Sequence, residues 1–290
     1  MATPSTDAAR PPVSFAERIS EHPFASGTPR VGWRGTLVTL IVLVVIGWSI
    51  AGTQVSPAEF ITSAPNMVDF IRRMFPPDWK FFLNRERVSE PTIVTMQIAI
   101  TGTALAVILA FPISLLASRN LSHPAIYQTI RAILNVIRSI PELIWALIFV
   151  SAVGLGPFAG TLALVAGSVG SLSKVFAESI ESINAESIES INPKPVEAME
   201  AVGAAQVQKI AFGVLPQALV NMVSYTLLYW EHNIRASFIV GAVGGGGLGF
   251  EITTELNLFQ YTHFLVHAII IIVLVTVADR ISAWIRSRLA

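Results

Sequence analysis

The sequence predicts an all-α protein that crosses a membrane six times, and two observations carry this prediction. The 290-residue chain is 53% hydrophobic and only 13% charged, and its mean hydropathy is +0.63, whereas a soluble domain averages about 25% charged residues. The apolar residues also gather in uncharged runs long enough for helices that cross a hydrocarbon layer of about 30 Å. The formal net charge is zero, so nothing in the overall charge points to a nucleic-acid partner.

The first two uncharged runs each predict one crossing. The run at 35–58 has a nearly all-aliphatic core from Leu37 to Ile50, and the second run covers Pro91 to Ser118. Residues 1–34 precede the first run as a polar tail. We expect this tail to stay in the protein, because the first run has too long a polar lead and no small-residue cleavage site close behind it for a signal peptide.

The remaining runs predict four more crossings. The run from Leu143 to Ser173 is too long for one crossing, and it is interrupted at 154–157 by Gly-Leu-Gly-Pro, which is typical of a turn. We therefore expect a third helix that ends there and a fourth that runs to about Phe176. Residues 215–240 and 262–285 supply the fifth and sixth crossings.

The positions of lysine and arginine predict the orientation, because basic residues collect on the cytoplasmic side of membrane proteins. One side would hold Arg10, Arg18, Arg30, Arg34, Arg119, Arg131, Arg138, Lys174, Lys194, Lys209, Arg286 and Arg288, so both termini are expected in the cytoplasm. The external loop at 53–90 argues against this, with five basic and five acidic residues. An apolar stripe made by Phe60, Met67, Phe70, Ile71 and Met74 predicts a helix in that loop. Two placements of this helix are open: on the membrane surface, or against an external partner that docks there.

A short motif lies in the predicted cytoplasmic loop at 177–216. Its residues are Glu197, Ala198, Met199 and Gly203, followed twelve positions after the glycine by Leu215 and Pro216. This spacing resembles the EAA signature of ABC importer permeases, although Met199 replaces an alanine and Gly213 an isoleucine of that signature. The resemblance implies a coupling helix that sits in a cleft of a separate ATPase subunit, with Glu197, Ala198, Gly203, Leu215 and Pro216 as the coupling residues.

The residues of this motif also suit a short helix on physical grounds. Pro195 can open a helix, because its missing amide hydrogen has no partner in the first turn. Glu197 in that turn complements the positive end of the helix dipole. Gly203 permits a sharp turn or a close backbone approach. The alternative is an ordinary amphipathic connector, which the spacing and the placement between two membrane helices disfavour.

Two further stretches, 138–150 and 229–249, are similar to the phosphonate ABC transporter permease, a methionine-permease-like type I ABC importer subunit. The first contains Pro-Glu-Leu, and the second contains Trp-Glu-His-Asn-Ile-Arg and a glycine cluster. The resemblance covers roughly residues 91–290. It implies the type I permease fold, a homodimer around one path in the bacterial inner membrane, two copies of an ATPase subunit, an external substrate-binding protein and contact with membrane lipid.

The resemblance also implies the substrate class and the division of labour between subunits. We expect import of phosphonate or a related oxyanion such as phosphate or phosphite, with another small solute such as methionine as the alternative. The chain has no Gly-Lys-Ser/Thr phosphate loop, no cofactor motif and no cysteine, so ATP hydrolysis is expected on the separate subunit and the chain itself is not expected to be an enzyme. A secondary transporter or channel that needs no ATPase is the other class considered, and the coupling motif argues against it.

Ionisable residues inside membrane helices are costly and are usually retained for function. Five such residues are candidates for the translocation path: Arg138, Glu142, Glu231, His232 and Arg235. Glu231 and Arg235 are four apart and can neutralise each other on one helix face, and Arg138 precedes Glu142 by the same interval. An anionic substrate would favour Arg235 or His232. The alternative is that these charges only hold helices together or lie near lipid headgroups.

Two other features need a structural answer. His263 and His267 have an i, i+4 spacing that a metal could use, but with no carboxylate close in sequence we expect no metal site. The octapeptide Ala-Glu-Ser-Ile-Glu-Ser-Ile-Asn occurs twice in tandem, at 177–184 and 185–192, where one copy would be expected. We expect the fourth helix to continue into the repeat, with the additional copy either absorbed in the loop or weakening the mechanical link to the coupling helix.

Overall fold

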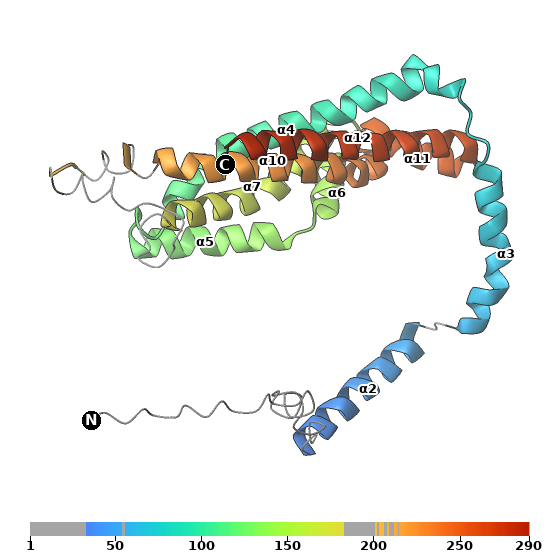
Figure 1. The fold of residues 1–290 in the computed structure, drawn as a ribbon, viewed down its shortest axis with the longest axis horizontal. Coiled ribbons are helices and arrows are strands. Elements are labelled where there is room, and N and C mark those ends of the chain that lie inside the picture. Colours follow the sequence, from blue (N-terminus) through green and yellow to red (C-terminus); the bar gives the residue numbers. More distant parts are fainter. Residues whose placement is uncertain are drawn as a thin grey trace, which may run out of the picture. The chain divides into compact units, whose positions relative to one another are not determined.

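The computed structural model describes residues 33–53, 56–182, 201, 203–205, 208, 212–213 and 215–289, and every element among them is helical (Figure 1). The helices are α2 (Trp33–Thr53), α3 (Pro57–Met74), α4 (Glu90–Leu116), α5 (Pro124–Ser139), α6 (Glu142–Val153), α7 (Pro157–Glu181), α10 (Leu215–Val240), α11 (Gly247–Asn257) and α12 (Tyr261–Leu289), with single turns η1 (Phe81–Leu83), η2 (Arg85–Ser89) and η5 (Gly241–Gly245). The all-α class is confirmed.

By length and composition, four single helices among the described residues can cross a membrane. These are α2, the segment from Arg85 through α4, α7 and α12. Two bent pairs, α5 with α6 and α10–η5 with α11, raise the number to six if each pair makes one crossing. The chain divides into two units, residues 1–67 and 68–290. Within the first, α2 has no buried residue, which suits an apolar helix that faces lipid.

The third crossing is not the single helix predicted to end at Gly154. Helix α6 has 12 residues and so spans only about 18 Å, well short of the hydrocarbon core. Helix α5 precedes it across a bend of 85°, and the pair fits either a broken crossing or a re-entrant loop. The cause of the bend is Pro141, which forces its predecessor Ile140 into extended backbone (φ −90°, ψ 117°). The predicted turn after α6 is confirmed, because Gly154 and Gly156 have φ of +92° and +134°.

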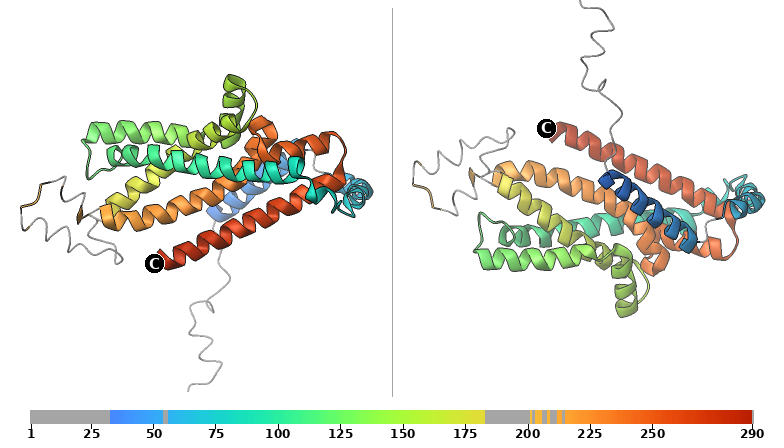
Figure 2. Two further views of the ribbon diagram at one scale, coloured as in Figure 1. Left: turned by 90° about the horizontal axis from the view of Figure 1, so that it is seen from above. Right: turned by 90° about the horizontal axis from the view of Figure 1, so that it is seen from below.

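Helix α7 forms the centre of the second unit and packs against α4, α5, α6 and α10. Figure 2 shows it between α5 on one side and α10 on the other, while α6 stands across the other helices. Small residues permit this close packing. A Cβ added to Gly170 would lie 3.0 Å from the Ile137 side chain, and one added to Gly102 of α4 would lie 3.0 Å from Leu164.

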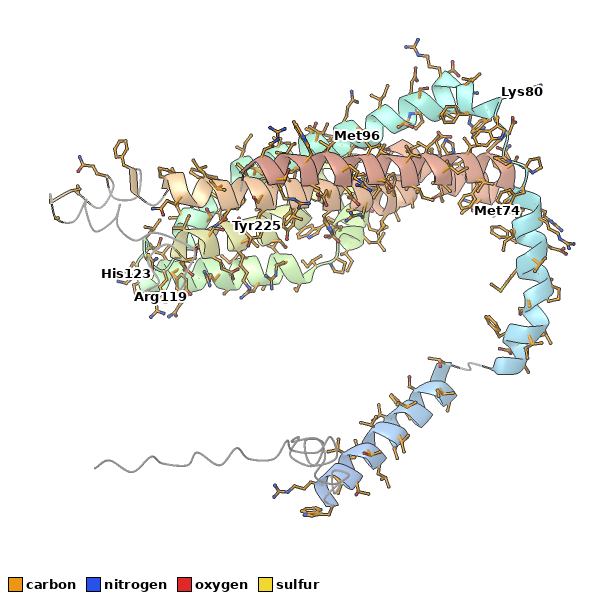
Figure 3. All side chains as sticks on the ribbon, viewed as in Figure 1. Met74, Lys80, Met96, Arg119, His123 and Tyr225 are labelled. Atoms are coloured by element: carbon orange, nitrogen blue, oxygen red, sulfur yellow. The ribbon has the colours of Figure 1, made fainter. Side chains whose placement is uncertain are left out.

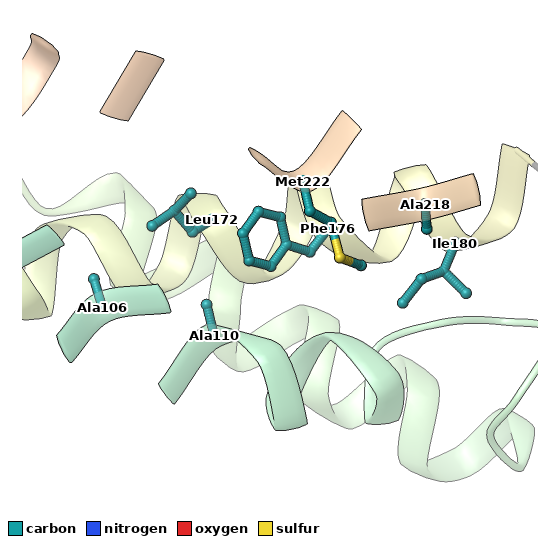
Figure 4. Packing of buried hydrophobic residues seen from close by; sticks show 7 residues of the cluster. All are labelled: Ala106, Ala110, Leu172, Phe176, Ile180, Ala218 and Met222. Atoms are coloured by element: carbon teal, nitrogen blue, oxygen red, sulfur yellow. The ribbon is translucent and has the colours of Figure 1, made fainter. Parts of the chain in front are cut away.

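The largest buried apolar cluster lies where α4, α7 and α10 meet. It consists of Ala106, Ala110, Leu172, Phe176, Ile180, Ala218 and Met222 (Figure 4). The alanines of α4 let the larger side chains of α7 approach its backbone. Because Ile180 belongs to this cluster, α7 runs to Glu181, past the expected end at Phe176 and into the predicted loop at 177–216. The continuation of the helix into the repeat is confirmed.

The helical body of the second unit has two well-separated ends. In Figure 3, Met74 and Lys80 lie at one end, and Arg119 and His123 lie at the other. The first end holds the turns η1 and η2 and the start of α12. The second holds the connection from α4 to α5 and the end of α7. By the predicted orientation, the first end is external and the second is cytoplasmic.

Candidate functional site

Glu142 and His232 of the predicted path lie side by side. Glu142 is in the first turn of α6 and His232 is on α10, and Glu142 Oε1 lies 3.2 Å from His232 Nε2. Gly167 of α7 makes room for this pair, because a Cβ there would lie 3.0 Å from Glu142 Cγ. Both side chains remain partly accessible, 37% exposed for Glu142 and 50% for His232. The pair therefore presents polar atoms at a surface of the helical body.

The four-residue interval between Arg138 and Glu142 suggested an ion pair. The structure shows no such pair. Arg138 lies in the last turn of α5 and Glu142 in the first turn of α6. The i, i+4 relation holds only within one continuous helix, and here the chain bends by 85° between the two residues. Arg138 is exposed, and Glu142 faces His232 of α10 instead.

Glu231 and Arg235 form a second cluster, on the side of α10 that faces α12. Arg286 Nη2 donates to Glu231 Oε1 at 3.0 Å, and Arg235 Nη2 lies 4.0 Å from Glu231 Oε2. Arg235 also donates to Asp279 Oδ1 at 2.6 Å. Glu231 is only 7% exposed. The expected Glu231–Arg235 pairing is therefore present, and α12 supplies one further ion-pair partner to each residue.

Asp279 and Arg286 were missed at the sequence level. Asp279 falls inside the predicted sixth crossing at 262–285. A carboxylate in an apolar run is expected to have an ion-pair partner. Asp279 could therefore have been recognised from the sequence as a candidate residue. The partner itself comes from α10, 44 residues earlier in the chain, and no sequence spacing indicates that pairing.

Asn233 fixes the rotation of α10 between these two clusters. It is fully buried, accepts a hydrogen bond from Ser168 Oγ of α7 at 2.9 Å and donates one to Thr103 Oγ1 of α4 at 2.9 Å. Buried polar groups need such partners, so this chain of hydrogen bonds sets which way each neighbour points. His232 consequently faces α6, and Glu231 faces α12.

The two histidines of α12 have separate partners. His267 is fully buried with Glu255 of α11. Its Nδ1 lies 2.8 Å from Glu255 Oε2, and its Nε2 donates to the Arg87 carbonyl oxygen at 2.8 Å. The ring of His263 stacks on Phe81 with 3.9 Å between centroids. Both histidines thus take part in packing and ion pairing, and the described residues contain no group of three or more His, Cys, Asp or Glu side chains that could hold a metal ion.

The coupling residues are only partly within the described residues. Glu197 and Ala198 lie outside them. Gly203 is exposed, has φ of +71°, and a Cβ added to it would meet no atom within 4 Å. Leu215 and Pro216 open α10, where proline is tolerated because the first-turn amides have no partner inside the helix. The assignment of these residues to coupling stays a prediction.

The end of α7 is held at the α4–α5 connection by Glu181. Arg131 Nη2 donates to Glu181 Oε2 at 2.9 Å, and the backbone N–H of Arg119 donates to Glu181 Oε1. Arg131 Nε also donates to the Ala117 carbonyl oxygen at 3.1 Å. Glu181 belongs to the first copy of the octapeptide, so that copy contributes both a buried side chain, Ile180, and a charged anchor.

The second unit is thus a body of apolar and bent helices packed around α7, with ion pairs between the helices. The family described as "Binding-protein-dependent transport system inner membrane component" matches residues 102–290, and the chain belongs to this family. It is thus a permease subunit of an ABC importer in the inner membrane. ATP hydrolysis takes place on a separate subunit, and the family implies an ATPase and a substrate-binding protein as partners.

Comparison with individual proteins agrees with this family. The chain is 37% identical to the phosphite transport system permease protein PtxC of Stutzerimonas stutzeri over 227 residues, 78% of each chain. It is 35% identical to the phosphate-import permease protein PhnE of Mycolicibacterium smegmatis over 269 residues, 92% of this chain and 48% of that one. The inward-facing MetNI methionine ABC transporter shares the fold, with a TM-score of 0.60 at 20% identity over 70% of this chain and 95% of that one.

Proposed function

We propose that this permease imports a phosphorus oxyanion, namely phosphonate, phosphite or phosphate. The observation that carries the proposal is the 37% and 35% identity to relatives named for phosphite and phosphate transport. The likeness to the methionine transporter is at 20% identity and supports the fold rather than methionine as substrate.

The experiment is reconstitution of the chain with its ATPase and its substrate-binding protein in proteoliposomes. We expect ATP hydrolysis to rise when a phosphonate, phosphite or phosphate is added, and not when methionine is added. Stimulation by methionine and by none of the three anions would replace the proposed substrate. The complex without the binding protein is the matched control, because the binding protein of such importers supplies most of the selectivity.

We further propose that two copies of the chain enclose one path, with both termini in the cytoplasm. The bent α5–α6 pair supports this arrangement, because α6 ends well short of a full membrane thickness and leaves apolar side chains such as Leu143, Ile144 and Leu147 40–49% exposed. A second copy would cover such a surface. The basic residues at the α4–α5 connection support the orientation.

Along this path, His232 is the side chain that we expect to meet the anion, with Glu142 as its positioning partner. The 3.2 Å contact and the partial exposure of both groups support this role. Arg235 is the second candidate, and Asp279 and Glu231 balance its charge as Glu142 would balance that of a protonated His232. His232→Ala should lower substrate transport while ATPase retention and thermal stability remain. A loss of thermal stability at unchanged transport per folded complex would instead assign the pair to helix packing.

A further inference from the structure

Helix α3 carries two opposite faces of contrasting chemistry. At 100° per residue, one half of its circumference is apolar apart from Ser63, and its apolar members are Phe60, Ile61, Ala64, Met67, Val68, Phe70, Ile71 and Met74. The other half carries Glu59, Thr62, Asn66, Asp69, Arg72 and Arg73. The apolar half is uncovered: Phe60 and Ile61 are 70% and 71% exposed, and Ile71 is 52% exposed. A helix of this pattern buries its apolar face against something outside the described residues.

We propose that the apolar face of α3 lies in the external surface of the lipid bilayer. An amphipathic helix with one clean apolar face and low overall hydrophobicity is suited to lie parallel to a membrane, with its apolar side chains below the headgroups. Arg72 and Arg73 on the polar face would then meet lipid phosphates. Helix α2 differs, because it is apolar around its whole circumference and suits a crossing.

Both ends of α3 are attached to membrane-crossing segments. Only residues 54–56 separate it from the end of α2, and four virtual bonds reach at most about 14 Å. At its other end, the Phe70 ring packs edge-on against Tyr261, the first residue of α12, with 5.0 Å between ring centroids. The C-terminal end of α3 therefore lies beside the first residue of α12, where that crossing begins.

The residues that follow α3 support a lipid surface rather than a protein partner. Phe75, Trp79 and Phe82 are 60%, 63% and 46% exposed. Tryptophan gathers at the height of lipid headgroups, and phenylalanine is typical of the apolar side of segments that lie in a membrane surface. Phe82 also borders an apolar cavity of about 320 Å³ between α4, α10 and α12. The apolar surface therefore continues from this segment onto the sides of the crossing helices.

The test uses the absence of cysteine from the chain, which allows single-cysteine variants without background labelling. Met67→Cys and Ile71→Cys place a fluorescent bimane on the apolar face, and Asn66→Cys and Asp69→Cys place it on the polar face as matched controls. The full transporter is reconstituted in phosphatidylethanolamine–phosphatidylglycerol vesicles with nitroxide-labelled lipid. We expect stronger quenching by the lipid nitroxide on the apolar face than on the polar face, because the apolar face lies below the headgroups, and the reverse order with aqueous iodide.

Equal quenching on the two faces would overturn the proposal. So would iodide access at Met67 and Ile71 that disappears only when the substrate-binding protein is added, because that result would assign the face to a protein partner. The measurement is independent of which anion the transporter carries, since it is made without substrate. Failure of the substrate assay would therefore leave this result intact.

Discussion

Several ionisable side chains inside the helical body pair with a partner on another helix. Glu142 with His232 joins α6 to α10, and Glu255 with His267 joins α11 to α12. Removing one partner from a buried pair costs more than the pair contributes, because the remaining group is left buried without compensation. The Glu255–His267 pair is the sharpest case, since neither side chain has any exposed area.

We expect Glu255→Ala to destabilise the protein by about 3–5 kcal/mol, the range for breaking a buried pair. Glu255→Gln should lower the stability much less. The glutamine amide N–H can donate to Nδ1 of a neutral His267 ring, and Nε2–H of that ring still donates to the Arg87 carbonyl oxygen. Glu251→Gln is the matched control on the same helix. Its 3.4 Å contact with Arg87 is partly exposed, so its loss should cost at most about 1 kcal/mol.

Thermal unfolding of the purified protein checks these three variants. Equal stability of Glu255→Ala and Glu251→Gln would show that the buried pair does not hold α11 against α12. Equal loss in Glu255→Ala and Glu255→Gln would show that the carboxylate charge, rather than the hydrogen bond, is what the site requires.

Asp78 gives a pH dependence at the predicted external end. The backbone N–H of Phe81 donates to its carboxylate and lowers the pKa of Asp78 below the ordinary value, assisted by the N–H of Lys80 and by His263. A lowered folded-state pKa means that the stabilisation is complete above the unfolded-state pKa, near 4, and is lost as pH falls through the folded-state value.

The advantage in unfolding temperature of the native protein over Asp78→Asn, followed from about pH 7 down to about pH 3, should therefore shrink below about pH 4. Unfolding scans of both proteins across this range test the expectation. An advantage that grows as pH falls would contradict the assigned direction of the pKa shift.

At the scale of elements, the end of α7 distinguishes two copies of the octapeptide that are identical in sequence. Residues 177–181 of the first copy lie in the last turns of α7, with Ala177 and Ile180 buried and Glu181 bound to Arg131. The second copy, 185–192, lies outside the described residues. Among the described residues, the packing and anchoring contacts are therefore those of the first copy.

We expect Glu181→Ala to cost about 1–3 kcal/mol, the range for losing hydrogen bonds to a charged group. Glu189→Ala is the matched control, with the same residue in the same local sequence, and it should change stability by less than about 0.5 kcal/mol. Unfolding midpoints of the two variants make the comparison. Equal effects would show that the second copy can take the place of the first.

Deleting residues 185–192 should preserve membrane insertion and stability, and should maintain or raise coupled transport. The reason is that the remaining copy keeps every contact made by Ile180 and Glu181. The chain between α7 and the coupling motif becomes shorter by one octapeptide. Transport and ATPase retention of the deletion variant are the measurements. Loss of ATPase assembly would show that the additional copy belongs to the docking surface.

At the scale of the whole molecule, the two ends of the second unit carry different kinds of surface. The end that we propose to be external holds the turns η1 and η2 and exposed aromatic residues. The other end holds the anchored terminus of α7. The coupling motif follows α7 in the chain, so movement of a docked ATPase would be transmitted through this end to the bent helices.

Gly203→Trp should leave the protein inserted but reduce coupling to the ATPase, and Glu197→Lys should act in the same direction. Gly154→Trp is the matched control, because both glycines have positive φ with no atom within 4 Å of an added Cβ. Gly154 has φ of +92° and ψ of 174°, a conformation that is essentially confined to glycine, so its replacement strains the backbone at least as much as replacement of Gly203 does. Transport and ATPase co-purification are measured, and normal values for both Gly203→Trp and Glu197→Lys would remove the coupling assignment.

The sequence by itself determined the all-α class, the family and the positions of most helices. Apolar runs of about 20 residues mark crossings because an unpaired backbone cannot remain in hydrocarbon. Gly154 to Pro157 marked a turn, and the stripe from Phe60 to Met74 marked a helix. These features are local, so composition and spacing along the chain are enough to reveal them.

Only the tertiary structure decided how the charged residues pair. Arg138 and Glu142 are close in sequence, yet the bend at Pro141 separates them and brings Glu142 to His232, 90 residues away. Asp279 and Arg286 reach α10 in the same manner. Such pairing depends on the rotation of each helix, which buried contacts such as those of Asn233 fix, and no spacing along the chain contains that information.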